Sequence, residues 1–119
     1  MSSKEVRVYL MDILEEIKNS QSFLGRIASF EKFAKNRRAV YACSRSLEIL
    51  GEAVKRMPGE FCKKHPEIPW KEIAGMRDKL IHDYSGARIG VIWKTIKDDL
   101  PKLKIQAEEV LEQLPLEKK

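Results

Sequence analysis

Apolar residues recur at intervals of three and four along almost the whole of this 119-residue chain. This spacing places side chains on one face of an α-helix, and no segment alternates apolar and polar residues over more than a few positions, as a half-buried strand does. An all-α protein is therefore predicted. Long helices joined by short loops pack antiparallel, so we expect one domain over residues 1–119, an up-and-down bundle of about four main helices with short helical segments.

The N-terminal part of the chain predicts one long helix and one short one. Over residues 4–27 the apolar positions recur at three, four and seven, while Lys, Glu and Asp occupy the opposite side. Ser29 has the position of an N-cap, which predicts a short helix over residues 30–35. The basic stretch 35–38 then opens the next helix.

The middle of the chain carries the cleanest apolar seam. Steps of three and four over residues 40–57 predict a helix of about twenty residues, and the Pro-Gly pair at 58–59 is expected to end it. At most one or two helical turns are expected over 60–64. Residues 65–70 contain two prolines and predict an extended connector, because a residue before proline is pushed out of the α region. We expect Trp70 to anchor this connector to the core.

The C-terminal half predicts two more helices. The first is expected over residues 71–81, ending near the Ser-Gly pair at 85–86. Its inward side chains are expected to be Ile73, Ala74, Met76, Leu80 and Ile81. The second has the longest apolar seam, over residues 89–114. Pro101 lies inside this seam and predicts a kink, because proline lacks an amide hydrogen and collides with the preceding turn.

The charge balance favours a polyanionic partner. Lys and Arg number 23 against 18 Asp and Glu, which gives a net charge of +5 at neutral pH. A basic surface attracts nucleic acid or other polyanions without identifying one of them. No glycine-rich loop with a P-loop or dinucleotide-binding pattern is present, so a nucleotide site on those scaffolds is excluded.

The cysteine count and the absence of long apolar runs indicate a compartment. Cys43 and Cys62 have no Cys-x-x-Cys spacing, which argues against a zinc ribbon or a disulfide framework and fits a reducing environment. Cys43 lies on an apolar seam and is expected to be buried. No stretch has the length of a signal peptide's apolar region or of a membrane span. We therefore expect a cytoplasmic protein that has no contact with a membrane.

Protic side chains are concentrated near the predicted end of the third principal helix, over residues 77–84. On an ideal helix Arg77 and Tyr84 point within about 20° of each other, whereas His82 is turned about 140° from Arg77. Either the helix unwinds before His82, or two copies of the segment face each other across a two-fold axis. A purely structural alternative is that His82 caps the last carbonyls while Arg77 pairs with an acid. The second histidine, His65, is expected to be solvated.

The spacing Arg77-x4-His82-x-Tyr84 resembles the signature of the HepT-like toxins, which belong to the HEPN superfamily of helical ribonucleases. The resemblance covers about residues 4–114. Three further blocks carry it in the same order, namely residues 46–56, residues 66–77, and Val91-Ile92-Trp93 followed by Asp99-Leu100-Pro101.

The resemblance implies a homodimer whose two motifs line one cleft, and a metal-independent endoribonuclease. In such an enzyme the ribose 2′-hydroxyl attacks the adjacent phosphate and leaves a 2′,3′-cyclic end. His82 would be the general base or acid, because histidine titrates near neutral pH. Arg77 would hold the scissile phosphate with its always-charged guanidinium. No metal-ligand spacing is present, and no cofactor is expected.

The resemblance also implies a protein partner, a nucleotidyltransferase antitoxin of the MNT type that transfers AMP to the motif tyrosine, here Tyr84. An anionic adduct there would repel an RNA phosphate. The basic side chains that could follow the RNA backbone are Lys79, Arg37, Arg38 and Arg88. Each of them can equally be a solvated surface charge.

Two other functions remain open from the sequence. A non-catalytic HEPN module could assist a nucleotidyltransferase by binding its substrate or nucleotide. A basic helical adaptor for nucleic acid would bind with a steep salt dependence and without need of His82 or Tyr84.

Overall fold

The computed structural model describes residues 3–82 and 87–115, and within them every regular element is helical. The predicted all-α class is confirmed. In chain order the elements are α1 (Ser3–Leu24), α2 (Phe30–Lys35), α3 (Arg37–Arg56), α4 (Gly59–Lys64), α5 (Trp70–His82), α6 (Ala87–Lys94), a π-helical turn η1 (Thr95–Asp99) and α7 (Leu100–Gln113). None of these helices is long and apolar enough to cross a membrane.

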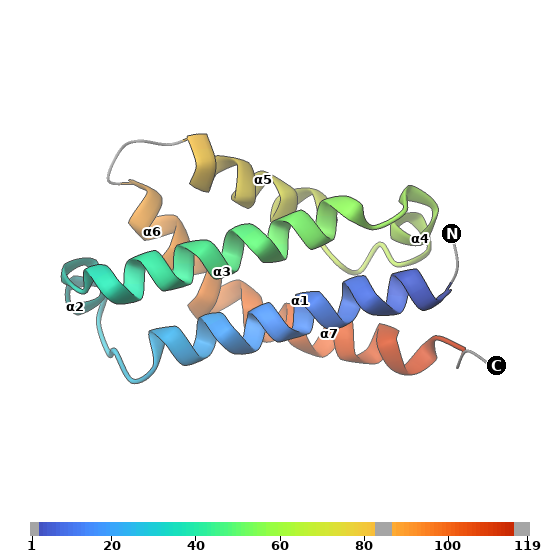
Figure 1. Ribbon diagram of the computed structural model, residues 1–119, viewed down its shortest axis with the longest axis horizontal. Helices are drawn as coiled ribbons and strands as arrows, with labels where there is room; N and C mark the ends of the chain where they lie inside the picture. Colours follow the sequence, from blue (N-terminus) through green and yellow to red (C-terminus); the bar gives the residue numbers. More distant parts are fainter. Residues whose placement is uncertain (1–2, 83–86, 116–119) are drawn as a thin grey trace.

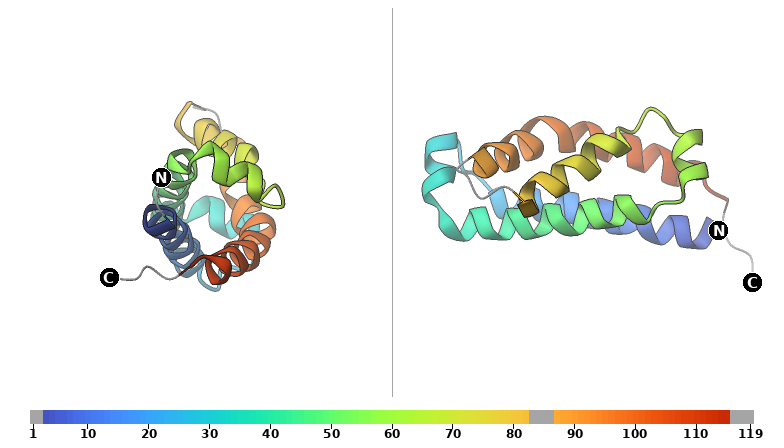
Figure 2. Two further views of the ribbon diagram at one scale, coloured as in Figure 1. Left: turned by 90° about the vertical axis from the view of Figure 1, so that its right-hand side faces the viewer. Right: turned by 90° about the horizontal axis from the view of Figure 1, so that it is seen from above.

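The long helices α1, α3, α5 and α7 form a bundle in an elongated molecule of 49 × 27 × 22 Å (Figure 1). Helices α1 and α3 lie side by side and antiparallel; α7 packs against α1, and α5 lies against α3 on the other side (Figure 2). The apolar faces of all these helices meet along the bundle axis. The fully enclosed side chains include Leu10, Ile13, Ile17, Phe33, Leu47, Leu50, Ile92, Leu100 and Val110.

Two turns near the N-terminal end follow from local chemistry. Helix α1 ends at Leu24, three residues before the predicted end, because Gly25 adopts a φ of 58° that only glycine reaches without strain. The predicted short helix over 30–35 is confirmed. Its N-cap Ser29 accepts a hydrogen bond at Oγ from the backbone N–H of Lys32, at 3.2 Å.

The middle helix has the predicted length of 20 residues, and its backbone turns extended at Met57 before Pro58. The expected anchor of the following connector is also present: the indole Nε1 of Trp70 donates a hydrogen bond of 2.9 Å to the carbonyl of His65. The expectation that His65 is solvated was wrong. Its ring lies 4.6 Å from that of Phe61, and only 17% of its side chain is exposed.

The C-terminal seam bends at η1, just before the predicted kink residue (Figure 1). The N–H of Leu100 donates to the carbonyl of Thr95, five residues back, which widens the helix by one residue. Pro101 then occupies the first turn of α7, where a helix needs no amide donor. On α5 the side chains of Ala74 and Ile81, expected to face inward, are half-buried.

The two cysteines are free and differ in their surroundings. Cys43 is fully enclosed 3.7 Å from the carbonyl oxygen of Ser20, and burial raises the pKa of its thiol to about 11. Cys62 is half-buried, and burial raises its pKa as well. At pH 8, a thiol-specific disulfide reagent is expected to modify Cys62 slowly and Cys43 only after unfolding in guanidinium. Equal labelling rates in the folded protein would contradict this burial.

Candidate active site

Arg77 of α5 packs directly against Gly51 of α3. A Cβ atom added at Gly51 of α3 would lie 2.6 Å from Cγ of Arg77 and nearer still to its Cβ. Only the absence of a side chain at Gly51 therefore allows this approach. The guanidinium lies 3.7 Å from Oε1 of Glu52 (Nη2) and 3.2 Å from Oδ1 of Asp78 (Nη1).

These two carboxylates hold the arginine in a partly enclosed position, with 23% of its side chain exposed. Asp78 also accepts a hydrogen bond of 2.6 Å from Lys55 of α3. The hydrogen bond from Lys55, with a smaller contribution from Arg77, lowers the pKa of Asp78. Its carboxylate therefore stays charged at neutral pH and keeps Arg77 in place. An ion pair between Arg77 and an acid was expected if the role of Arg77 were purely structural. The same ion pairs also fix the guanidinium in a position from which it can bind a ligand.

The Nε atom of Arg77 is buried and has no hydrogen-bond partner within the described part of the chain. Each Nη atom carries two N–H groups, so within the described part of the chain the guanidinium also keeps Nη donors after its two ion pairs. A phosphate or carboxylate oxygen is the kind of acceptor that would use them.

His82 is the last residue of α5 and is exposed to solvent. The helix continues through it, so unwinding before His82, one of the two alternatives drawn from the sequence, does not occur. The buried positions of α5 are Ile73, Met76 and Leu80, and on an ideal helix His82 points about 150° away from their mean direction. Arg77 and His82 therefore lie on different faces. Tyr84 lies outside the described residues, and the expectation for it stays a prediction.

The structure divides the four predicted basic residues into two groups. Lys79 is exposed on α5, near Arg77 and His82 along the chain, whereas Arg37 and Arg38 are exposed at the start of α3. Arg88 of α6 joins Arg37 at one cavity of about 220 Å³. An exposed aromatic residue that the sequence analysis did not single out, Tyr41, also lines this cavity. The sequence feature that could have indicated Tyr41 is its position four residues after Arg37 on one helix, where two side chains are neighbours.

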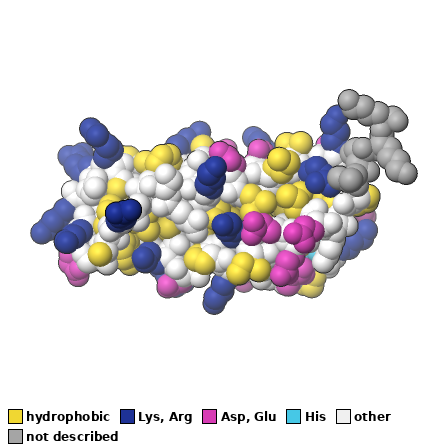
Figure 3. Space-filling view, turned by 90° about the horizontal axis from the view of Figure 1, so that it is seen from below, with side chains coloured by type: hydrophobic (Ala, Val, Ile, Leu, Met, Phe, Trp, Pro, Cys, Tyr) yellow, Lys and Arg dark blue, Asp and Glu magenta, His cyan; other side chains and the backbone are white. Residues whose placement is uncertain are grey.

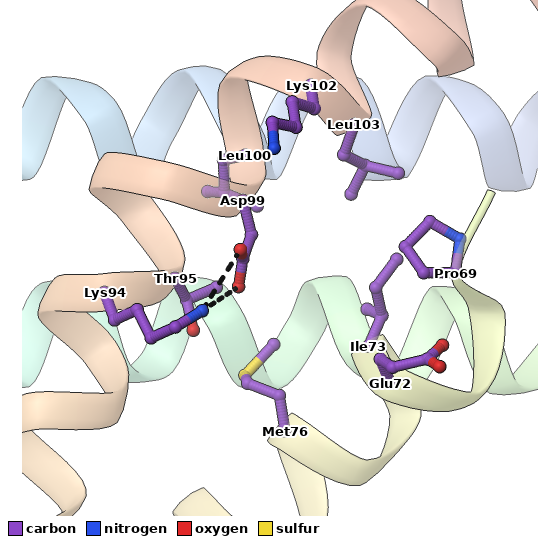
Figure 4. A pocket seen from close by; sticks show the side chains of 10 residues that line it. All are labelled: Pro69, Glu72, Ile73, Met76, Lys94, Thr95, Asp99, Leu100, Lys102 and Leu103. Atoms are coloured by element: carbon purple, nitrogen blue, oxygen red, sulfur yellow. Dashed lines mark hydrogen bonds and ion pairs between the residues drawn. The ribbon is translucent and has the colours of Figure 1, made fainter. Parts of the chain in front are cut away.

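A second hollow lies between α5 and the segment of η1 and α7, with a volume of about 300 Å³ (Figure 4). Ile73 and Met76 come from one side and Leu103 from the other, while Lys94 and Asp99 form an ion pair of 3.4 Å at the edge. The sequence could not predict this hollow, because its walls come from helices that meet only in the folded chain. Among the described residues, no group of three or more His, Cys, Asp and Glu is placed to hold a metal ion.

Known proteins resemble this chain over most of its length. The family described as "Ribonuclease HepT-like" matches residues 13–110. A protein of Caldanaerobacter subterraneus subsp. tengcongensis named "Putative RNase TTE0752" is 49% identical over 92% of this chain and 96% of its own length. "Probable ribonuclease HepT" of Thermococcus cleftensis is 48% identical over 86% of this chain and 92% of its own length.

No solved structure matches the chain at a significant level. The family match covers most of the chain, and both relatives align over nearly their entire length. The resemblance drawn from the motif of Arg77 and His82 and from the three sequence blocks is thereby confirmed. The chain belongs to the HepT-like family of ribonucleases.

Proposed function

We propose that this ribonuclease is a metal-independent endoribonuclease, the toxin of a toxin-antitoxin pair, and that it acts as a homodimer. The placement of Arg77 and His82 on different faces of one uninterrupted helix carries the dimer proposal. A single protomer cannot aim both side chains at one phosphate. A second copy related by a two-fold axis supplies the missing group, with the C-terminal ends of the two α5 helices facing each other.

The chemistry assigned to these residues is transfer of the scissile phosphate to the neighbouring 2′-oxygen. One His82 imidazole accepts the 2′-hydroxyl proton as the 2′-oxygen bonds to phosphorus. The bond to the 5′-oxygen breaks, and a water molecule donates a proton to that leaving oxygen, while His82 of the other protomer acts in the same way at the second site. The Arg77 guanidinium binds the phosphate and offsets the negative charge that develops on it. The products are a 2′,3′-cyclic phosphate and a 5′-hydroxyl end.

The proposed antitoxin is a nucleotidyltransferase of the MNT type that transfers AMP from ATP to Tyr84. Tyr84 follows His82 by two residues, so an adduct there would bring a bulky anion close to the base. Such an anion repels the substrate phosphate and competes for Arg77. A cytoplasmic location fits the RNA substrate and the two free cysteines.

We expect the purified protein to cleave single-stranded RNA in the presence of EDTA. The products should carry 5′-hydroxyl ends, which polynucleotide kinase labels without prior phosphatase treatment, and acid should open their cyclic phosphates. Cleavage that requires added Mg²⁺ would contradict the metal-independent mechanism. Protein that binds a nucleotidyltransferase and never cleaves RNA would instead support the non-catalytic HEPN module.

A further inference from the structure

Tyr41 of α3 is a large aromatic side chain with 59% of its surface exposed, and Arg37 lies on the preceding turn. Nη2 of Arg37 donates a hydrogen bond of 3.3 Å to the tyrosine hydroxyl, and Cζ lies 5.9 Å from the ring centroid. The hydrogen bond and charge of Arg37, with a smaller contribution from the charge of Arg88, lower the pKa of Tyr41. The ring therefore lies in a positive field with one part of its surface open.

Arg88 reaches the same place from α6. Its Nη2 donates a hydrogen bond of 2.6 Å to the hydroxyl of Ser44, which fixes the guanidinium against α3. Its Nε is buried and has no partner within the described residues. A guanidinium has five N–H donors, and among the described residues only Ser44 accepts from the Nη atoms of Arg88, which leaves Nη N–H groups for a ligand.

Around these side chains is the cavity of about 220 Å³, whose apolar lining consists of Ala34, Val40 and Ile89. None of the described residues that line it is a carboxylate. An aromatic face, an apolar wall and two guanidinium groups are the features that hold an unpaired base by stacking and its phosphate by charge. An acidic peptide would use the arginines but would leave the aromatic face and the apolar wall unexplained.

The surroundings also favour a strand of nucleic acid over a single small anion. The end of the molecule that carries α2 is rich in Lys and Arg (Figure 3). Lys32, Lys35 and Arg38 are exposed there, next to Arg37. A strand leaving the cavity toward α2 therefore meets further positive charge.

The cavity and Arg77 share one face of α3. Ser44, which holds Arg88, and Gly51, which Arg77 covers, are seven residues apart, so they point in nearly the same direction at a separation of about 10 Å. From Tyr41 to Gly51 the distance along the helix is about 15 Å. Roughly four nucleotides cover this distance at the duplex spacing of about 3.4 Å per phosphate, and fewer do so when the strand is extended.

We propose that Tyr41, Arg37 and Arg88 form a subsite for one nucleotide of a single-stranded RNA substrate, a few nucleotides from the bond that is cut. The base stacks on Tyr41, and the adjoining phosphate binds Arg88 and Arg37. This proposal rests on the proposed ribonuclease function for its substrate, but it concerns binding and not the chemical step.

The first test measures binding by fluorescence anisotropy with a fluorescein-labelled ten-nucleotide oligoadenylate, in protein that also carries His82→Ala so that cleavage is slow compared with the measurement. Tyr41→Ala is expected to weaken binding about 5- to 100-fold, the size of one lost stacking contact. Tyr41→Phe should retain most of the affinity. Arg88→Gln should weaken binding. It should also reduce the slope of log affinity against log salt concentration by about one, the value for one lost phosphate contact. Phe23→Ala, which removes another exposed aromatic ring (46% exposed), is the matched control.

The second test compares substrates of different length in protein with an intact His82. Tyr41→Ala should raise KM for the ten-nucleotide RNA while leaving kcat, and the cleavage of a dinucleotide, unchanged. The subsite would be overturned if Tyr41→Ala and the parent protein bound the ten-nucleotide RNA with equal affinity. It would also be overturned if Tyr41→Ala weakened the binding of a protein partner but not that of RNA. If the parent protein binds RNA through Tyr41 yet cuts no RNA, the subsite stands and the proposed catalytic function fails.

Discussion

Replacing His82 with alanine is expected to lower the rate of RNA cleavage by about 10²- to 10⁴-fold, the contribution of a positioned general acid or base. The side chain is exposed at the end of α5, so its loss should change the free energy of unfolding by no more than about 0.5 kcal/mol. Single-turnover cleavage of a labelled RNA measures the first quantity, and thermal unfolding followed by circular dichroism measures the second.

His65 provides the matched control, because it is the only other histidine in the chain. It lies in the connector before α5, and its ring packs at a tilt against that of Phe61. His65→Ala should leave the cleavage rate of the folded protein unchanged, even if it lowers stability. Cleavage at the parental rate by His82→Ala would remove His82 from the mechanism.

The same variant tests whether the site is shared between protomers. If Arg77 of one copy acts with His82 of the other, a heterodimer of Arg77→Lys and His82→Ala chains contains one intact site and one doubly altered site. Unfolding and refolding the two inactive variants together should then restore up to one quarter of the parental activity. Half of the randomly formed dimers are mixed, and one of the two sites in each mixed dimer is intact. No recovery in a verified heterodimer would place both residues in one protomer's site.

Gly51→Ala is expected to lower cleavage by about 10²-fold, although Gly51 itself has no reactive group. The new Cβ would lie 2.6 Å from Cγ of Arg77, so α5 must move away from α3. A displacement of about 1 Å in a positioned group is enough for a rate loss of that size. Crowding of the helix contact should also cost about 1 to 3 kcal/mol, from which the better helix propensity of alanine recovers up to about 1 kcal/mol.

Gly75→Ala is the corresponding control on α5. A Cβ there meets nothing within 4 Å, so the substitution brings only the gain in helix propensity, about 0.5 to 1 kcal/mol. Its activity should equal that of the parent protein. Rates for both glycine variants and their urea unfolding curves give the comparison. A fully active Gly51→Ala protein would show that the close contact of α3 with Arg77 is irrelevant to catalysis.

The limits of most helices could be predicted because they depend on neighbouring residues. Ser29 caps the short helix through a bond three residues away, and α3 ends just before Pro58, whereas Gly59 already belongs to α4. The prediction for α1 was three residues too long because apolar spacing continues past Gly25, whose positive φ ends the helix. The bend expected at Pro101 lies in η1, just before it. Pro101 itself lies in the first turn of α7, where a proline is tolerated better than in the interior of a helix.

The candidate site was predictable only as a set of residues. The spacing of Arg77 and His82 on one helix is a local property, and so is the pairing of Arg37 with Tyr41 one turn apart. The contact of Arg77 with Gly51 and that of Arg88 with Ser44 join residues 26 and 44 positions apart. Contacts between residues so far apart leave no periodic pattern in the sequence.

The amino-acid sequence by itself determined the helical class and the lengths of the main helices, because both follow from the α-helical repeat of 3.6 residues. The assignment of Arg77, His82 and Tyr84 to RNA chemistry came from the resemblance of their spacing to the HepT-like signature, and it stays a prediction. Only the tertiary structure decided that α5 stays helical through His82, that Arg77 is held by Glu52 and Asp78, and that Arg88 meets Tyr41 at one cavity. These features depend on how closely distant helices pack, and that closeness is set by side-chain volume at single contact points such as Gly51.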